Sequence, residues 1–329
     1  MKIAVFSTKS YDQQYFENYS IDSRYTFSFF ETALNKDTAS LTNGFDAVCI
    51  FVNDSVDKNT IDILSKNGIR LIALRCAGFN NVDIEAAKSN NIKVVRVPAY
   101  SPEAVAEHAV ALILTLNRKT HKAYNRVREG NFSLKNLIGF NLYGKTIGVI
   151  GTGQIGATFC RIIKGFGCKI IAFDVSKSDE LVQQGVEYLS LDEVFQESDI
   201  LSLHCPLNAS TKHIVNEKSI ALMKDGVMII NTSRGALINT ADVITGLTSK
   251  KIGYLGIDVY EQEEKLFFED LSESIIEDDL ILKLISFPNV LITSHQAYFT
   301  KEAMDEITTT TLQNIEAFDK NLELKNEVV

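Results

Sequence analysis

The chain has 329 residues, of which 45% are hydrophobic, and this length suits two domains better than one. Its formal net charge of −9 disfavours nucleic acid or an anionic membrane as the main partner, since both attract clustered Lys and Arg. The longest nearly apolar stretch, residues 104–116, is too short to cross a bilayer, and residues 2–6 resemble a strand rather than a secretory signal. We therefore expect a cytoplasmic protein.

The cysteines and histidines show no metal or redox pattern. The five cysteines are odd in number and none is separated from another by two residues, so we expect reduced, mostly buried thiols. They are Cys49, Cys76, Cys160, Cys168 and Cys205. No H-E-x-x-H occurs, and we expect no metal site.

The first hundred residues alternate short apolar runs with polar stretches of helical length. Strands are expected near residues 3–7, 47–52, 71–75 and 94–97, a rhythm typical of parallel βα units. Two prolines then interrupt the pattern, which predicts a domain boundary near residue 100 and a helix from about residue 103. Because residues 104–116 are apolar almost all round, we expect this helix to be buried between domains or subunits.

A second βα series begins at Lys145. Its strands are expected near residues 146–150, 169–173, 200–204, 227–231, 253–257 and 290–294. The acidic segment 261–280 is interpreted as a solvated loop with short helical pieces. A final helix over about 302–320 is expected to pack back on the first domain. The chain as a whole is therefore predicted to form two doubly wound α/β domains.

A dinucleotide fingerprint opens the second series. Gly151, Gly153 and Gly156 form a G-x-G-x-x-G that follows an apolar strand and precedes a helix expected over 157–166. The next strand ends in Asp174, 18 residues after Gly156, where an acid suits a ribose diol and repels the 2′-phosphate of NADP. This βαβ unit predicts NAD binding.

The remaining strands of the series also end in polar residues. These ends carry His204 with Cys205 and Pro206, then Asn231 to Arg234, Asp258 and His295. Ligands of doubly wound sheets bind beyond the carboxyl ends of the strands. An Arg holds a carboxylate and a His exchanges a proton near neutral pH, so the pair suits a 2-oxo acid that receives hydride from a nicotinamide.

Several longer motifs resemble the D-isomer-specific 2-hydroxyacid dehydrogenase family. They are the glycine loop, Asn231-Thr232-Ser233-Arg234-Gly235, residues 258–263 and Thr293-Ser294-His295, and the likeness covers the whole chain. Within that family the chain is most similar to the fermentative bacterial D-lactate dehydrogenases, through residues 74–83, 97–100 and 266–270.

The resemblance implies both the domain arrangement and the reaction. Residues 1–100 with 298–329 would form a flavodoxin-like substrate domain, and residues 101–297 a Rossmann domain that binds NAD. The expected reaction is the reversible reduction of pyruvate to D-lactate by NADH, in a homo-oligomer, dimer or tetramer.

The resemblance also assigns roles to individual residues. Arg234 would bind and polarise the substrate, His295 would donate the proton, and Glu263 would pair with His295 and sustain its charged form. The backbone of Ala77 and Gly78 would receive the substrate carboxylate. The cofactor contacts it implies, with the glycine loop included, are Gly151, Gly153, Gln154, Ile155, Gly156, Asp174, Cys205, Pro206, Thr211, Thr232, Ser233, Arg234 and Asp258.

Some residues keep two interpretations. Three aromatic residues either line a pocket for a small apolar substrate side chain or simply pack at a domain boundary; they are Tyr100, Tyr298 and Phe299. The other histidines are interpreted as structural: His108, His121, His204 and His213. Ser294 stands where the family often has Pro, which leaves the imidazole available.

Two alternative functions remain open. The substrate is another small 2-oxo acid, such as glyoxylate, hydroxypyruvate or 2-oxoisocaproate, or the chain is an NAD(H)-sensing, corepressor-like binding protein. The acid at Glu263 argues for a carbonyl substrate, because the formate-specific relatives lack it.

Overall fold

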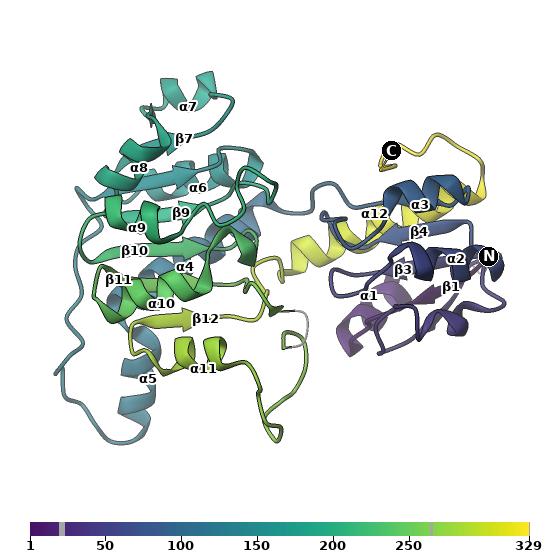
Figure 1. Cartoon of the computed structure of the whole chain (residues 1–329), viewed down its shortest axis with the longest axis horizontal. Helices are drawn as coiled ribbons and strands as arrows, with labels where there is room; N and C mark the ends of the chain where they lie inside the picture. Colours follow the sequence, from purple (N-terminus) through teal and green to yellow (C-terminus); the bar gives the residue numbers. More distant parts are fainter. Residues whose placement is uncertain (20–23, 264–265, 329) are drawn as a thin grey trace. The chain divides into compact units, whose positions relative to one another are not determined.

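The computed structural model describes residues 1–19, 24–263 and 266–328 and divides the chain into two compact units (Figure 1). Unit 1 consists of Met1–Ser101 and Phe299–Val329, and unit 2 of Pro102–Tyr298. Unit 1 is therefore built from two separate parts of the chain.

Unit 1 is a parallel five-stranded sheet with helices on both faces. Its strand order is β2-β1-β3-β4-β5, the flavodoxin-like order, which confirms the predicted doubly wound class. The strands are β1 (Lys2–Val5), β2 (Thr26–Phe29), β3 (Ala47–Ile50), β4 (Leu71–Leu74) and β5 (Lys93–Val95). The helices are α1 (Ser10–Tyr19), η1 (Ala39–Thr42), α2 (Lys58–Lys66), α3 (Ile84–Ser89) and α12 (Lys301–Asp319).

The sequence analysis missed strand β2. Its residues alternate between aromatic and small polar side chains and are exposed or half-buried, as on an edge strand, whereas the predicted strands are continuous buried runs. The expected packing of the last helix on the first domain is confirmed: α12 contacts α1 and β4, and Ile315 is buried with Phe16 and Leu71 in the core of unit 1.

Unit 2 contains a parallel seven-stranded sheet in the order β12-β11-β10-β9-β6-β7-β8. The order reverses between β6 and β9, as in Rossmann folds. The strands are β6 (Thr146–Ile150), β7 (Lys169–Phe173), β8 (Glu187–Tyr188), β9 (Ile200–Leu203), β10 (Val227–Asn231), β11 (Ile252–Ile257) and β12 (Val290–Ile292). The short edge strand β8 was not predicted.

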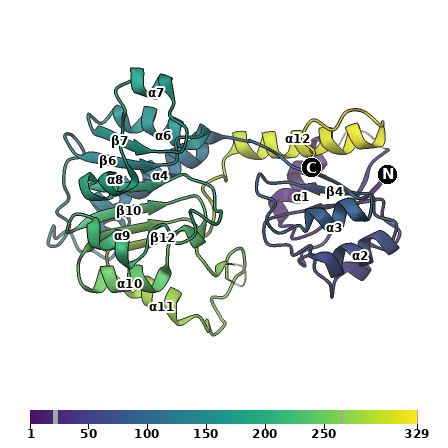
Figure 2. The same ribbon diagram turned by 45° about the horizontal axis from the view of Figure 1, so that its top comes forward.

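Helices cover both faces of this sheet (Figure 2). They are α4 (Pro102–Arg118), α5 (Thr120–Arg128), α6 (Gln154–Lys164), α7 (Asp179–Gln183), α8 (Leu191–Glu197), α9 (Glu217–Leu222), η2 (Gly235–Leu237), α10 (Thr240–Thr248) and α11 (Asp279–Ser286). Alternate residues of β10 face different cores: Met228 and Ile230 join the core with α4 and α6, and Ile229 joins the other. Because both faces of the sheet are buried, the sequences of these strands are continuous apolar runs.

Two expectations for unit 2 need correction. The apolar helix α4 packs against α6 and strands β10 to β12 of its own unit, which accounts for its burial without a second domain. Helix α6 begins at Gln154 rather than at residue 157, because the glycine loop turns directly into the helix. The segment 261–280 is a largely solvated loop with short helical pieces, as expected: Glu263 has a 3-10 helical conformation and α11 begins at Asp279, while residues 264 and 265 lie outside the described part.

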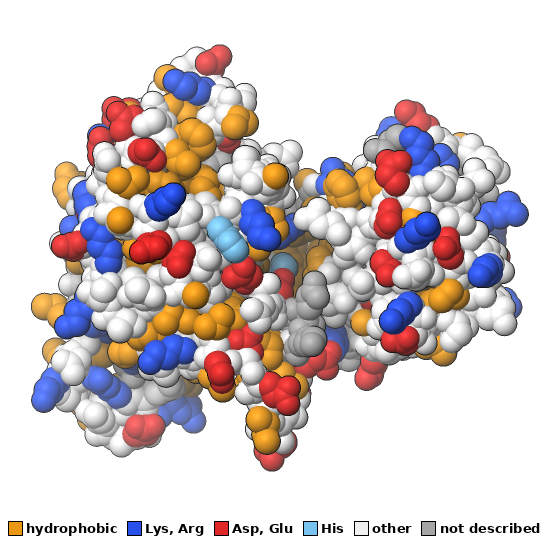
Figure 3. Space-filling view, viewed as in Figure 1, with side chains coloured by type: hydrophobic (Ala, Val, Ile, Leu, Met, Phe, Trp, Pro, Cys, Tyr) orange, Lys and Arg blue, Asp and Glu red, His pale blue; other side chains and the backbone are white. Residues whose placement is uncertain are grey.

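On the face shown in Figure 3, basic side chains are interspersed with acidic ones. This face therefore carries no extended surface of one charge. Among the described residues, none of the helices is both long and apolar enough to span a membrane.

Candidate active site

The glycine loop lies between β6 and α6, at the carboxyl edge of the unit 2 sheet. Gly151 has φ +92°, and a Cβ atom there would lie 2.5 Å from the backbone N of Cys205. A Cβ at Gly156 would lie 2.0 Å from the Gly151 carbonyl oxygen. Both positions therefore require glycine, for a tight turn and for close packing of the helix on it.

Gly153 has a different surrounding. A Cβ at this position would meet no atom within 4 Å, so the loop leaves open space in front of the α6 N-terminus. Gln154 and Ile155 begin that helix, whose first N–H groups have no partner within the helix. This open, donor-rich end of an 11-residue helix fits the pyrophosphate of a dinucleotide.

Asp174 follows β7 and lies beside the glycine loop. Its Oδ2 accepts hydrogen bonds from Thr152 N at 2.5 Å and Thr152 Oγ1 at 3.1 Å, and its Oδ1 accepts from Ser176 N at 3.0 Å. Tyr188 of the unpredicted strand β8 donates to Thr152 Oγ1 at 2.9 Å. The carboxylate is therefore fixed next to the loop, in the position expected of a ribose ligand.

The ends of β9 and β10 complete this side of the site. Thr232 Oγ1 is buried without a hydrogen-bond partner in the described part of the chain, and such an orphaned hydroxyl fits a cofactor contact. Ser233 Oγ donates to the Cys205 carbonyl at 2.7 Å, and Thr211 Oγ1 donates to the Pro206 carbonyl at 2.6 Å. The bond from Ser233 joins the loops after β9 and β10, and the bond from Thr211 closes the loop after β9.

His295 and Glu263, 32 residues apart in the chain, form a close pair. His295 Nδ1 lies 2.8 Å from Glu263 Oε1, and the two side chains are 16% and 22% exposed. The Tyr260 N–H donates to Glu263 Oε2 at 2.8 Å, which fixes the carboxylate. With Nδ1 occupied, the imidazole has Nε2 available for proton exchange with a substrate.

Asp258 organises the loop that carries His295. Its carboxylate is completely buried and accepts from Gln296 N at 2.9 Å and Ala297 N at 2.8 Å, as well as from the Thr293 hydroxyl. The Asp258 carbonyl accepts from His295 N at 2.7 Å. These bonds hold His295 at φ +52°, a left-handed conformation that is uncommon for a residue with a side chain.

His108 is a site neighbour that the sequence analysis interpreted only as structural. Its Nε2 lies 3.0 Å from Thr293 Oγ1 and 3.4 Å from the buried Asp258 carboxylate. Because the two histidines are far apart in sequence, no local pattern relates α4 to the His295 loop.

Arg234 follows β10 at the same edge of the sheet. Its Nη1 donates to the Ser233 carbonyl at 2.7 Å, and the Asn231 side chain holds the Arg234 carbonyl at 2.9 Å. Within the described residues, no carboxylate lies within ion-pair distance of this half-buried guanidinium. It is therefore free to bind a carboxylate or carbonyl oxygen of a ligand.

Two aromatic rings flank the His295 imidazole. The Phe268 and Tyr298 ring centroids lie 5.9 and 6.5 Å from that of His295. Phe268 was part of a motif but was not predicted as a site residue. Phe299 belongs instead to unit 1, where it makes an edge contact with Tyr11 at 4.7 Å.

Two of the three remaining histidines, His204 and His213, make structural contacts. His204 Nε2 lies 2.8 Å from Ser202 Oγ and its Nδ1 is buried without a partner in the described chain, so burial lowers the pKa of His204 to about 3. His213 Nε2 lies 2.5 Å from Glu261 Oε1, which ties the loop after β9 to the loop after β11. Burial also lowers the pKa of His121.

The predicted carboxylate-binding residues of unit 1 follow β4. Ala77 and Gly78 are half-buried in the loop between β4 and α3, and Tyr100 is half-buried in the segment after β5. Their part in the site stays a prediction.

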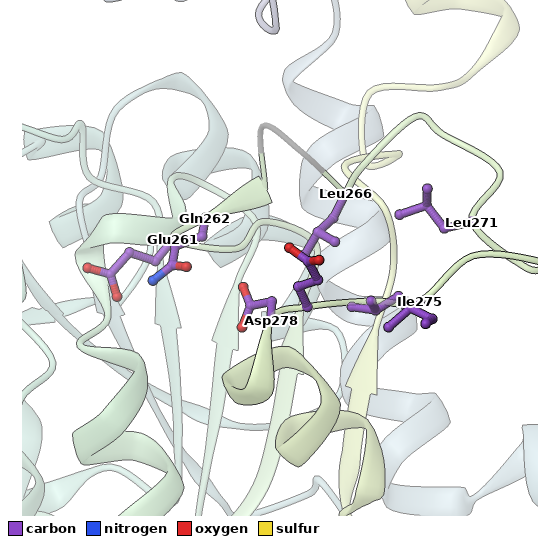
Figure 4. A pocket seen from close by; sticks show the side chains of 8 residues that line it. Glu261, Gln262, Leu266, Leu271, Ile275 and Asp278 are labelled. Carbon is purple, nitrogen blue, oxygen red and sulfur yellow. The ribbon is translucent and has the colours of Figure 1, made fainter.

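A cavity of about 640 Å³ lies in unit 2 and is lined by residues of the acidic segment 261–280 (Figure 4). Glu261 and Gln262 lie at one end, Leu271 and Ile275 at the other, and Asp278 between them. None of Arg234, Glu263 and His295 lines this cavity, so it is separate from the predicted chemistry.

The five cysteines are free, and burial raises the pKa of Cys205 to about 11, so its thiol stays protonated beside the glycine loop. Among the described residues no cluster of three His, Cys, Asp or Glu side chains suits a metal ion.

The fold and the residues at the edge of its larger sheet define an NAD-dependent oxidoreductase. The model of the D-isomer specific 2-hydroxyacid dehydrogenase NAD binding domain matches residues 110–297. A D-lactate dehydrogenase of Escherichia coli (strain K12) is 52% identical over the full length of both chains, and a 2-hydroxyacid dehydrogenase homolog of Haemophilus influenzae is 52% identical over 96% of this chain and 95% of its own.

Solved structures agree with these relatives. The apo-structure of D-lactate dehydrogenase from E. coli matches with a TM-score of 0.91 and 50% identity, covering 100% of both chains. D-lactate dehydrogenase from Aquifex aeolicus, solved with NAD and lactic acid, matches with a TM-score of 0.83 and 35% identity over 97% of this chain and 96% of its own. The chain therefore belongs to the D-isomer specific 2-hydroxyacid dehydrogenase family, which confirms the resemblance and the NAD cofactor.

Proposed function

We propose that this enzyme catalyses the reversible reduction of pyruvate to D-lactate. The observation that carries the proposal is the 2.8 Å pair of His295 and Glu263 at the same sheet edge as the unpaired Arg234, in a chain 52% identical over its full length to a D-lactate dehydrogenase. An acid–base histidine and a carboxylate-binding arginine are the two groups that a 2-oxo acid requires.

Each group has a defined task in this proposal. Arg234 binds the substrate and polarises its carbonyl, while the N–H groups of Ala77 and Gly78 receive the carboxylate. His295 donates the proton to the carbonyl oxygen, and Glu263 stabilises the imidazolium before that transfer. Bound NADH supplies the hydride, which no protein side chain can provide. Tyr100 and Tyr298 are proposed to wall the small methyl group of the substrate.

A panel of 2-oxo acids tests the proposal. We expect the highest kcat/KM with pyruvate and NADH, a turnover well above one per second, and D-lactate as the product in chiral analysis. If glyoxylate, hydroxypyruvate or 2-oxoisocaproate gave a higher kcat/KM than pyruvate, that acid would be assigned as the substrate instead. A racemic or L product would refute the stereochemical assignment, and NADH binding without turnover would favour a sensing protein.

Two further proposals concern the setting of the enzyme. Five free cysteines suit a reducing compartment, so we place the protein in the cytoplasm.

Between residues 124 and 143, six large apolar side chains are more than half exposed. We propose that a second subunit covers them in a homo-oligomer, either a dimer or a tetramer. The six side chains are those of Tyr124, Val127, Phe132, Leu134, Ile138 and Tyr143. Light scattering of the wild type and of Ile138→Asp tests this; equal, monomeric masses would refute it.

A further inference from the structure

The loop between β4 and α3 presents backbone donors that the protein itself leaves unused. Ala77 and Gly78 are half-buried, and no group in the described part of the chain accepts a hydrogen bond from either N–H. Consecutive backbone N–H groups without a partner in the protein suit an anion. The proposed function places the substrate carboxylate here.

Arg96, which directly follows β5, holds this loop from one side. Its Nη1 donates to the Ala77 carbonyl oxygen at 2.8 Å. The guanidinium also lies over the Phe79 ring, 5.2 Å from the ring centroid. Arg96 thus contacts the residues immediately before and after Gly78.

The bond to Ala77 determines where the Gly78 N–H points. A trans peptide unit is planar, so the Ala77 carbonyl and the Gly78 N–H point in opposite directions, and the structure contains no cis peptide bond among its described residues. Fixing the carbonyl on Arg96 therefore directs the N–H away from the guanidinium. The charged donor also polarises the amide, which strengthens that N–H as a hydrogen-bond donor.

The main chain of Arg96 is itself held by the C-terminal part of unit 1. Its N–H donates to the Asn326 carbonyl at 3.1 Å, and Asn314 Nδ2 donates to the Arg96 carbonyl at 2.9 Å. Asn326 Nδ2 in turn donates to Asn314 Oδ1 at 2.9 Å. Both ends of the Arg96 backbone are therefore fixed, and its side chain starts from a defined position.

We infer that Arg96 is a positioning residue for substrate binding: it holds the Ala77 carbonyl so that the Gly78 N–H faces the carboxylate of the 2-oxo acid. The inference rests on the proposed function, which assigns carboxylate binding to this loop. Arg96 acts through the peptide unit and does not touch the substrate.

Kinetics of Arg96→Met and Arg96→Lys test this role. With Arg96→Met we expect the KM for pyruvate to rise about tenfold, with kcat and the KM for NADH changed less than twofold, because binding that is equal in ground and transition states is lost. Arg96→Lys should show an intermediate rise, since an ammonium keeps one hydrogen bond but not the flat contact with Phe79.

Arg70→Met is the matched control. Arg70 is an exposed arginine of the same unit whose side chain makes no hydrogen bond or ion pair in the described chain, and its loss should leave all constants unchanged. Methyl pyruvate, which lacks the carboxylate charge, should respond to Arg96→Met less than twofold. An unchanged pyruvate KM, or equal losses for NADH or methyl pyruvate, would overturn the inference.

Oxamate binding separates this inference from the proposed function. Calorimetry on the NADH-saturated enzyme measures carboxylate binding without turnover. Arg96→Met should raise the Kd for oxamate about tenfold, the same factor as expected for the pyruvate KM. A wild type that fails to reduce pyruvate would refute the proposed reaction, while the oxamate affinities would still decide the role of Arg96. Equal oxamate affinity in the wild type and Arg96→Met would overturn that role.

Discussion

The side chains proposed to act on the substrate differ in how their surroundings fix them. His295 is held by Glu263 through its ring and by Asp258 through its backbone N–H, whereas Arg234 bonds only the neighbouring Ser233 carbonyl with its side chain. We therefore expect changes at Arg234 to act on the ligand directly. Changes around His295 should act through its charge and orientation.

Arg234→Lys should not be a conservative change. An ammonium cannot supply the planar fork that binds a carboxylate or carbonyl, so kcat/KM for pyruvate should fall by about 100-fold or more. The NADH Kd should change little, because Asp174 and the glycine loop remain. Fluorescence titration with NADH beside steady-state kinetics measures both, and equal losses would contradict a substrate role for Arg234.

Glu263→Gln should slow the reduction of pyruvate. The amide keeps the shape of the side chain but loses the negative charge that faces His295 Nδ1 at 2.8 Å. Because the proposed reaction requires His295 to donate a proton, kcat/KM for pyruvate should fall by about 100-fold, while the NADH Kd should change little.

Steady-state kinetics and a fluorescence titration with NADH measure the two effects. The comparison of kcat/KM requires a slow substrate for which chemistry limits the rate. An unchanged kcat/KM for pyruvate would contradict the role of Glu263 beside His295.

His204→Gln should reduce the acid sensitivity of folding. Burial lowers the pKa of His204 to about 3, so the native state stays neutral there while the unfolded state binds a proton below about pH 6.5. This difference removes stability as the pH falls, by about 1.4 kcal/mol between pH 7.5 and 5.5. Urea unfolding at both pH values measures the free energy of unfolding. Its decrease from pH 7.5 to 5.5 should be smaller in His204→Gln than in the wild type, by up to that amount. Equal decreases in the two proteins would contradict burial of a neutral ring.

At the scale of elements, the βαβ unit of β6, α6 and β7 combines three separate requirements. Gly151 and Gly156 permit the close turn, the α6 N-terminus offers unpaired N–H groups, and Asp174 is fixed by Thr152. Strand β8 adds Tyr188, which binds the same threonine. The predicted ribose ligand Asp174 is therefore held by residues of three neighbouring strands of the sheet.

Asp174→Ser should narrow the preference for NADH over NADPH. Serine keeps a hydrogen-bonding group but removes the charge that repels a 2′-phosphate, so NADH use should weaken and NADPH use should improve. We expect the ratio of their kcat/KM values to fall at least about tenfold. An unchanged ratio would mean that Asp174 does not face the ribose.

At the scale of the whole molecule, the chain leaves unit 1, forms unit 2 and returns to unit 1 through α12. This helix supplies Ile315 to the unit 1 core and Asn314 to the backbone of Arg96. The first hundred residues consequently lack part of their own core until the end of the chain has folded onto them.

A chain that ends at Tyr298 should separate the two units functionally. Unit 2 is intact in this variant, so NADH affinity should stay within about threefold, while unit 1 loses α12 and exposes apolar core surface. Pyruvate reduction should be lost. Reduction at the wild-type rate, or loss of NADH binding, would contradict this division.

The sequence by itself determined the elements whose signal is local. The buried strands appear as short apolar runs, the glycine loop has a fixed spacing, and Asp174 ends the next strand, so the class of fold and the NAD cofactor were predictable. The pair of Glu263 and His295 was predictable only through the family resemblance. No spacing rule relates residues 32 positions apart.

The tertiary structure decided the features that depend on distant contacts. Edge strands β2 and β8 have weak local signals because they are short or half-buried, and the sheets reveal them. Helix α4 is buried by packing within unit 2, and His108 contacts Asp258, which is 150 positions away in the chain. The support of Ala77 by Arg96 likewise requires β4 and β5 to lie side by side. Local sequence patterns determine which segments form strands and helices, but long-range packing selects their neighbours.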